Sequence, residues 1–367
     1  MNRAIYVEEP ERFIRHTEER NFIGPGTFRL EDGSILMAAP WGRPPTNFEQ
    51  LAAMYPVPMF YRSRDGGRTW QEEGRMRLPW SLAGMISDGG ISFLRLQDGR
   101  LVFLAHRHVQ NLYGGGLPVL AFSTDNGVTW TPPQFVGDPE GVWYVMNDRL
   151  LQMKSGRLVV PVAHMPKGSG TYEGDRNLGV CFFSDDGGAS WRRSRAPADL
   201  ADGRGMAEPC VAEVAPGRLV MLARTGSGSH HRSWSADGGD TWSVPEPTTL
   251  EAACSPLTLR TLPDGRLILF YNHAAPLSGN AFFPRTPLCY SVSVDGGLTW
   301  GEPVLVDDAG TVLKDRQVIY PSVCFTDEGM LLVYSEHVAD PQGSFANGGE
   351  DGWKMGGGKR CILRYPE

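Results

Sequence analysis

The chain has 367 residues, 42 acidic against 35 basic side chains, and a formal net charge of −7. This balance gives no indication of a basic surface for nucleic acid, and no apolar run of about 18 residues is present to span a membrane. Its 45 glycines and 28 prolines, with almost no helical periodicity, favour a molecule of strands and turns. The polar N-terminus does not resemble a signal peptide. The six widely spaced cysteines without a CxxC pair predict buried free thiols, so we expect a cytoplasmic protein.

An octapeptide of the form Ser-x-Asp-x-Gly-x-Thr-Trp recurs at 63–70, 123–130, 184–191, 235–242 and 293–300, with Ser190 once replacing Thr. Its Asp can accept hydrogen bonds from nearby backbone N–H groups and close a turn, and its Gly tolerates positive φ. Each copy follows a strand-like run such as VLAFS. We therefore interpret these Asp boxes as structural hairpin turns, with the Trp buried between neighbouring units.

A second repeat runs in step with the first and consists of a turn glycine followed by an apolar strand. Six copies occur, at 33–40, 99–106, 156–164, 217–224, 265–273 and 329–337. Multi-stranded repeats with a period of about 50–65 residues are typical of propellers. The sequence therefore predicts one all-β domain over residues 1–367, a six-bladed β-propeller with five Asp boxes. Either the last strand (CILRY) or the N-terminal AIYVEE is expected to complete a shared blade and close the ring.

Equivalent positions in the six repeats are predicted to face one another around the axis, because the innermost strands of a propeller converge. Positions that lie nine residues before the turn glycine are Gly24, Gly90, Asn147, Glu208, Pro256 and Tyr320. Positions seven or eight residues after it include His106, His164, Arg224, His273 and Glu336. Residues that served only the scaffold would repeat, whereas these differ and many are polar. The pattern indicates a mouth that binds a ligand.

Five Asp boxes on six blades resemble the sialidase (neuraminidase) superfamily over nearly the whole chain. More specific likenesses are the stretches AEPCVAEVAPGRLVMLAR, FFPRTPLCYSVSVDGG, IYPSVCFTDEGMLLVYSE and APWGR. The family residues that they match are, in that order, Glu208 and Arg224, Arg285, Tyr320 and Glu336, and Arg43.

The resemblance implies an exo-glycosidase that releases a terminal acidic sugar, such as sialic acid, from a glycan. Tyr320 would be the nucleophile and Glu208 would take its proton, since a neutral phenol avoids the repulsion that a carboxylate nucleophile meets at a carbon bearing a carboxylate. Arg224 and Arg285 would bind the substrate carboxylate through forked contacts. Arg43 and Glu336 join the predicted binding residues, and neither a cofactor nor a metal is expected.

Two parts of the family pattern are absent. The first-blade Arg-Ile-Pro motif is replaced by NFIGPGTF, and the acid/base Asp is missing from AMYPVPMFYRS. Asp88 is our candidate for the catalytic acid, because it lies two residues before the register of Glu208. Asn147 and Arg149 alternate along one face, and Arg149 is our candidate for a third cation.

Four histidines, His106, His164, His273 and His337, lie seven or eight residues after a turn glycine. At least one of them, with His106, His164 and His273 as our candidates, is expected to bind sugar hydroxyls or to act as acid or base, and ordinary packing at the strand ends is the alternative. A metal site is disfavoured, because the alternation of a strand keeps His106 from converging with the others.

Two other functions remain open at this point. One is a lyase acting on a sugar that contains uronic acid, and the other is a carbohydrate-binding propeller without activity. Analysis of the products separates them, since a hydrolase releases a saturated sugar, a lyase an unsaturated one and a binding protein nothing. Fold alone cannot choose among them.

Overall fold

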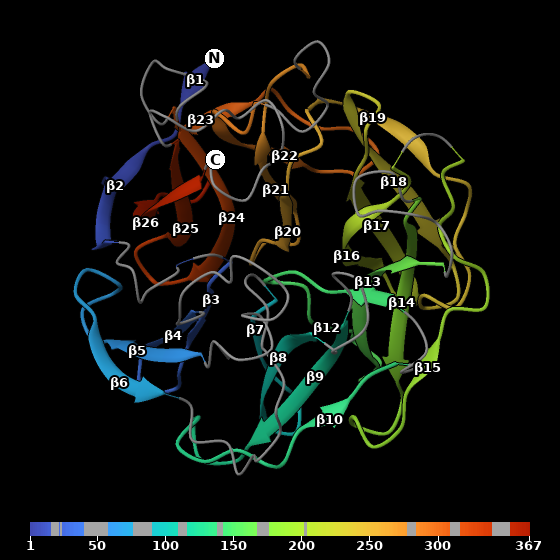
Figure 1. Cartoon of the computed structure of the whole chain (residues 1–367), viewed down its shortest axis with the longest axis horizontal. Coiled ribbons are helices and arrows are strands. Elements are labelled where there is room, and N and C mark those ends of the chain that lie inside the picture. The colour runs from blue at the N-terminus through green and yellow to red at the C-terminus, as the bar shows by residue number, and fades with distance from the viewer. Residues whose placement is uncertain are drawn as a thin grey trace.

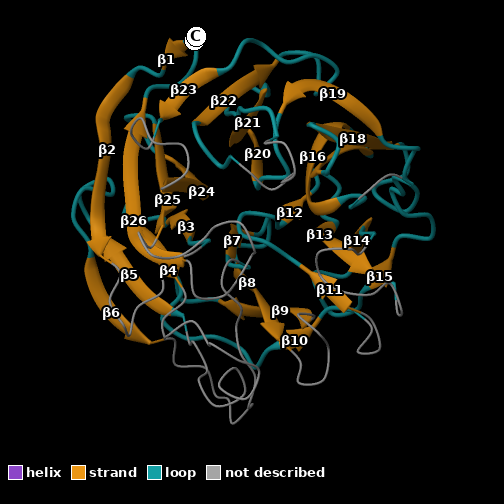
Figure 2. Ribbon diagram, turned by 45° about the horizontal axis from the view of Figure 1, so that its top comes forward, coloured by secondary structure: helices purple, strands orange, loops and turns teal. Residues whose placement is uncertain are grey.

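The computed structural model describes residues 1–15, 22, 24–39, 58–75, 90–108, 116–137, 142–166, 176–201, 204–276, 284–308, 316–339 and 353–367. Within these residues the chain forms strands and loops only (Figure 2). No helix among them is long and apolar enough to cross a membrane.

Six antiparallel units follow one another along the chain. The first two are β3 (Gly26–Arg29), β4 (Ile35–Ala39), β5 (Met59–Ser63) and β6 (Gln71–Arg75), then β7 (Ser92–Arg95), β8 (Leu101–His108), β9 (Gly116–Ser123) and β10 (Gln134–Phe135). The third is β12 (Leu151–Gln152), β13 (Leu158–Met165), β14 (Leu178–Ser184) and β15 (Arg192–Arg193). Strand β11 (Val142–Tyr144) pairs with both β9 and β13 and joins the second and third units into one sheet.

The fourth unit is β16 (Ala207–Ala215), β17 (Arg218–Arg224), β18 (Ser229–Ser235) and β19 (Glu246–Glu251). The fifth is β20 (Leu257–Thr261), β21 (Leu267–Asn272), β22 (Leu288–Ser293) and β23 (Val304–Asp307). The sixth is β24 (Arg316–Phe325), β25 (Met330–Ala339), β26 (Trp353–Leu363) and the N-terminal β2 (Tyr6–Arg15). The sheets stand around a central axis, with β3, β7, β16, β20 and β24 nearest the centre (Figure 1). The predicted six-bladed propeller with five Asp boxes is confirmed.

Both ends of the chain take part in closing the ring. Strand β2 pairs antiparallel with β26 in the sixth blade, and β1 (Asn2–Arg3) pairs parallel with β23 in the fifth. The sequence left open whether the last strand or the N-terminal segment completes the shared blade; both do.

Unbroken apolar strands such as RLVMLAR arise because each blade is packed between two others. Met221 of β17 packs with Phe183 of the third blade, whereas its neighbour Val220 packs with Leu267 of the fifth. Both faces of the strand are therefore buried, so alternation with polar residues is lost. The six cysteines are buried and free, as predicted.

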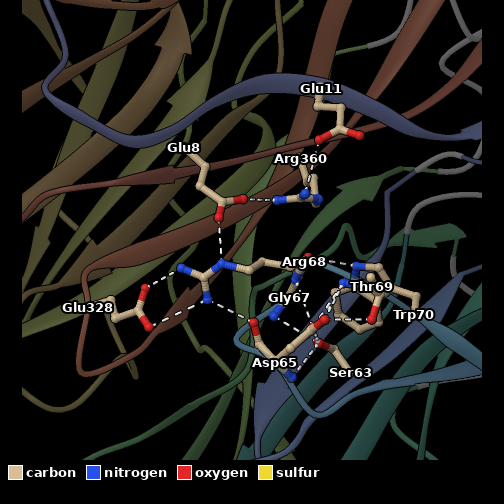
Figure 3. Close-up of polar contacts among 10 residues, drawn as sticks. All are labelled: Glu8, Glu11, Ser63, Asp65, Gly67, Arg68, Thr69, Trp70, Glu328 and Arg360. Atoms are coloured by element: carbon tan, nitrogen blue, oxygen red, sulfur yellow. Dashed lines mark hydrogen bonds and ion pairs between the residues drawn. The ribbon is translucent and has the colours of Figure 1, made fainter.

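Each Asp box is a turn held by hydrogen bonds among its own residues. In the first, the backbone N–H of Gly67 donates to Ser63 Oγ (2.8 Å), the N–H of Thr69 donates to Asp65 Oδ1 (2.9 Å), and Trp70 Nε1 donates to the Gly67 carbonyl (3.0 Å) (Figure 3). Burial acts to raise the pKa of Asp65, but the bonds from Thr69 and Ser63 outweigh it and lower that pKa to about 2. This confirms the boxes as structural turns.

Candidate functional site

Glu208 and Tyr320 occupy equivalent irregularities in two innermost strands. Both have left-handed backbone, with φ of 46° and 54°. The pairing register of β16 shifts between Ala207 and Cys210, and that of β24 shifts between Ile319 and Ser322. Such bulges re-aim a side chain, and left-handed non-glycine residues are typical of functional sites.

The two side chains meet across the ring, as their shared register predicts. Tyr320 Oη donates to Glu208 Oε1 at 3.3 Å, and Arg224 Nη2 lies 2.8 Å from the same oxygen. Glu208, Tyr320 and Arg224 are 6%, 7% and 2% exposed. Glu208 Oε2 has no hydrogen-bond partner among the described residues, so a buried carboxylate with spare acceptor capacity faces a phenol.

Arg285 lies within electrostatic range of this cluster. Burial is the largest cause that lowers the pKa of its guanidinium and nearby Arg224 adds to it, whereas Tyr320 and Glu208 oppose the shift. The N–H of Val318 donates to the Arg285 carbonyl at 3.1 Å, which fixes the Arg285 backbone beside β24. The structure thus gathers four of the sequence-predicted residues, Tyr320, Glu208, Arg224 and Arg285.

Asn147 lies beneath Tyr320 and joins three blades. Its Nδ2 donates to the carbonyls of Tyr320 (3.1 Å), Pro321 (3.2 Å) and Pro25 (3.3 Å). The next residue, Asp148, accepts from the Val323 N–H at 2.7 Å. These bonds hold the backbone around Tyr320 and favour a positioning role for Asn147.

Arg149 completes this central hub, which we define as residues 147–149. Its Nη1 donates to the Asn147 carbonyl and its Nη2 to the Leu257 carbonyl, both at 2.8 Å. Since both terminal nitrogens bind main chain, the contacts favour a brace over a third ligand for a substrate carboxylate.

The predicted histidines contact aromatic rings and main chain. Buried His106 bonds through Nε2 to the Trp143 carbonyl at 2.8 Å, and the ring of His164 stacks on Trp143 with centroids 4.0 Å apart. These contacts favour packing. His273 sits edge-on to Tyr271, and its buried Nδ1 has no partner among the described residues. No group of three or more metal-ligand residues lies together in the described ranges.

Glu336, one of the predicted binding residues, is almost fully buried and binds arginines. It accepts from Nε of Arg12 at 2.7 Å and from Nη2 of the same residue, and Arg316 Nη1 lies 3.7 Å away. Two other predicted residues, Asp88 and Arg43, lie outside the described residues.

Sequence reasoning missed Asp148, Arg12 and His230. Burial, with His231 and Arg224 nearby, lowers the pKa of His230 to about 3, so this ring is neutral at pH 7. Nothing in the stretch SHHRSWS distinguishes His230 as a functional residue from sequence alone. Asp148 could have been found because it lies between the predicted residues Asn147 and Arg149. Arg12 could not, because its partner Glu336 lies 324 positions away in the sequence.

An Asp-box propeller with a buried Tyr–Glu–Arg cluster at its axis defines the class of this protein. The profile of the BNR repeat-like domain matches residues 114–333, and that of the BNR/Asp-box repeat matches residues 61–72. The chain belongs to the BNR repeat-like domain family and is related to sialidases.

Two sialidases are similar in sequence. One, from Micromonospora viridifaciens, is 26% identical over 277 residues, which cover 65% of this chain and 39% of that protein. The other, from Bacteroides fragilis, is 28% identical over 290 residues, covering 68% and 49%. The matches thus span less than half the length of either relative.

Solved structures share the fold. A protein of unknown function from Dyadobacter fermentans has a TM-score of 0.73 at 19% identity, covering 99% of this chain and all of that one. The intramolecular trans-sialidase from Ruminococcus gnavus has a TM-score of 0.67 at 17% identity, covering 97% of both chains. At these identities the likeness establishes the propeller alone.

Proposed function

We propose that the protein is an exo-glycosidase of sialidase type that releases a terminal acidic sugar from a glycan. The observation that carries the proposal is the buried contact of Tyr320 Oη with Glu208, beside Arg224 and Arg285. Relationship to sialidases adds to it, although a propeller fold by itself hosts many functions.

In this reaction Tyr320 Oη attacks the anomeric carbon while its proton passes to Glu208. The bond from that carbon to the leaving oxygen breaks, and an acid protonates the oxygen; Asp88 is our candidate for this acid. Water then attacks the anomeric carbon and gives a proton to the carboxylate that the acid has become. The bond from that carbon to Tyr320 Oη breaks, and Glu208 returns its proton to the phenolate. Arg224 and Arg285 bind the carboxylate of the sugar throughout, as charge-assisted forks.

The test is product analysis with a sialoside, the parent protein and Tyr320→Phe. We expect a saturated free sugar, and a loss of kcat on the order of a thousandfold or more in Tyr320→Phe with ligand binding retained. An unsaturated product absorbing in the ultraviolet would identify a lyase, and no product from any acidic glycoside would identify a binding protein. Tyr320→Phe activity within tenfold of the parent would exclude Tyr320 as the nucleophile.

A further inference from the structure

A groove between the second and third blades combines aromatic side chains with one arginine. It has a volume of about 450 Å³, and its wall includes Phe135 of β10, Phe182 of β14 and Trp191 of the third Asp box. Arg193 of β15 also lines it, and no acidic side chain is among the described residues that do so. Strands β10 and β15 are the outermost strands of their blades, so the groove lies at the rim of the ring and not at its axis (Figure 1).

The arginine of the groove differs from its neighbour in the sequence. Arg193 stands directly opposite Phe182 in the sheet, which places it on the groove face and Arg192 on the other face. Arg192 donates to Asp185 at 2.7 Å. Arg193 is exposed, its guanidinium carbon lies 5.6 Å from the ring centre of Trp143, and it has no hydrogen bond or ion pair with a described residue. The groove therefore holds a positive charge without a counter-ion.

The aromatic wall is packed in place. The indole N–H of Trp191 donates to the Gly188 carbonyl at 3.2 Å, so Trp191 offers the groove ring surface and not a donor. Phe135 is 42% exposed. Gly137 has a φ of 119°, and a Cβ there would come within 2.9 Å of the Phe182 ring. Glycine at this position lets the backbone pack directly on that ring.

The positive charge is particular to the third blade. In the five Asp-box units, the residues two positions after the Trp are Glu72, Pro132, Arg193, Val244 and Glu302. A residue that the turn required would recur, whereas these differ in charge and size. The arginine is therefore not part of the Asp-box scaffold and is available for another role.

We propose that this groove is a second glycan-binding site, which takes an acidic sugar unit at a distance from the candidate catalytic centre. The choice of an acidic sugar rests on the proposed function. The C–H face of the sugar ring packs on Phe135 and Trp191, and its carboxylate accepts the parallel N–H donors of Arg193. The volume lies within the range of about 300–1,000 Å³ typical of small-ligand sites, so it has room for a sugar unit.

A second site changes how the protein meets a glycan with many acidic ends. While the groove holds one end, another is presented to the axis at a raised effective concentration. The groove should therefore lower KM for a sialylated mucin and leave kcat/KM for a small aryl sialoside unchanged.

The direct test is nuclear magnetic resonance of the Trp191 indole N–H during titration with 3′-sialyllactose. The Tyr320→Phe protein is used so that the probe is not cleaved, and Trp191→Phe assigns the resonance. We expect Arg193→Ala to weaken the binding reported by Trp191 by about threefold to tenfold, as for one hydrogen bond at an exposed site. Phe135→Ala, which removes ring surface alone, should also weaken it, and the neutral probe lactose should bind more weakly than the acid. Arg192→Ala is the matched control and should bind as the parent does.

The kinetic test compares a sialylated mucin with an aryl sialoside in proteins that keep Tyr320. Arg193→Ala should raise KM for the mucin at least about threefold, through loss of the second attachment, and leave the aryl sialoside unchanged. An equal change on both substrates would overturn the second site.

The two proposals fail in different ways. A Trp191 resonance that does not respond to 3′-sialyllactose, or equal weakening in Arg192→Ala and Arg193→Ala, overturns the groove; turnover of a sialoside that is lost in Tyr320→Phe then leaves the proposed function standing. A response that depends on Arg193, in a protein that turns over no acidic glycoside, supports the groove and refutes the proposed function.

Discussion

Removing Arg224 alone should destabilise the protein far more than removing its ion pair with Glu208. Both side chains are almost fully buried and their closest atoms are 2.8 Å apart. Arg224→Met leaves the Glu208 carboxylate buried without its principal cation, at a cost of about 3–5 kcal/mol. The double variant Arg224→Met, Glu208→Gln removes both charges at nearly constant volume, so it should recover at least about 2 kcal/mol of that loss.

The assay is urea unfolding followed by fluorescence of the ten tryptophans, with the m-value checked for constancy. Arg192→Met is the control, because Arg192 and its partner Asp185 are exposed, and such a pair contributes at most about 1 kcal/mol. Neither the single nor the double variant should turn over a sialoside. If the double variant is no more stable than Arg224→Met, the unpaired Glu208 carboxylate does not lower the free energy of unfolding as we expect. The reasoning that places a buried ion pair at the centre of the site is then refuted.

Three further predictions concern the substrate, the hub and the boxes. Arg285→Ala should lower kcat/KM for an acidic glycoside at least tenfold, since a hydrogen bond to a charged group contributes about 1.5–3 kcal/mol; a neutral analogue should be unaffected, and equal losses on both would refute the contact. Asn147→Ala should cost about 1–3 kcal/mol in urea unfolding and lower kcat more than it raises KM, because it frees the Tyr320 backbone; a fall in stability with unchanged kcat would contradict positioning. Asp65→Asn should be less stable than the parent at pH 7, and the gap should close as pH falls from about 4 towards 2: the folded pKa of Asp65 is lowered to about 2, so its stabilisation is complete above the unfolded value of 3.8 and is lost as pH falls through the folded one. A gap that stays constant down to pH 2 would refute this.

The fold was predictable because its signals are local. Each Asp box encodes its own turn within eight residues, and each turn glycine introduces one strand, so counting them gives the blades. The Tyr320–Glu208 contact was predictable from a shared register, although the residues lie 112 positions apart, because repeats place equivalent positions around one axis.

Other features depend on contacts without a repeat. Register and polarity together made Asn147 and Arg149 resemble ligand-binding residues, since a sequence cannot show that their donors point at main-chain carbonyls. The Arg12–Glu336 pair joins the N-terminal strand β2 to β25 within the last blade, so it exists only once the ring has closed. Register predicts which residues approach the axis. It does not predict which of them are available to a ligand and which hydrogen-bond the main chain of neighbouring blades.

Backbone strain gives a second, independent indication of where this propeller is specialised. Of the four described non-glycine residues with positive φ, Asn126 lies in an Asp-box turn, and the others are Asp148, Glu208 and Tyr320. Left-handed backbone costs such residues on the order of 1–3 kcal/mol each and persists only where the surroundings enforce it. Here they do: Asn147 holds the Tyr320 carbonyl, and the Tyr320 phenol meets Glu208. A propeller that only needed to close could leave its inner strands regular, so the concentration of strain at these residues indicates a centre shaped to aim side chains at a ligand.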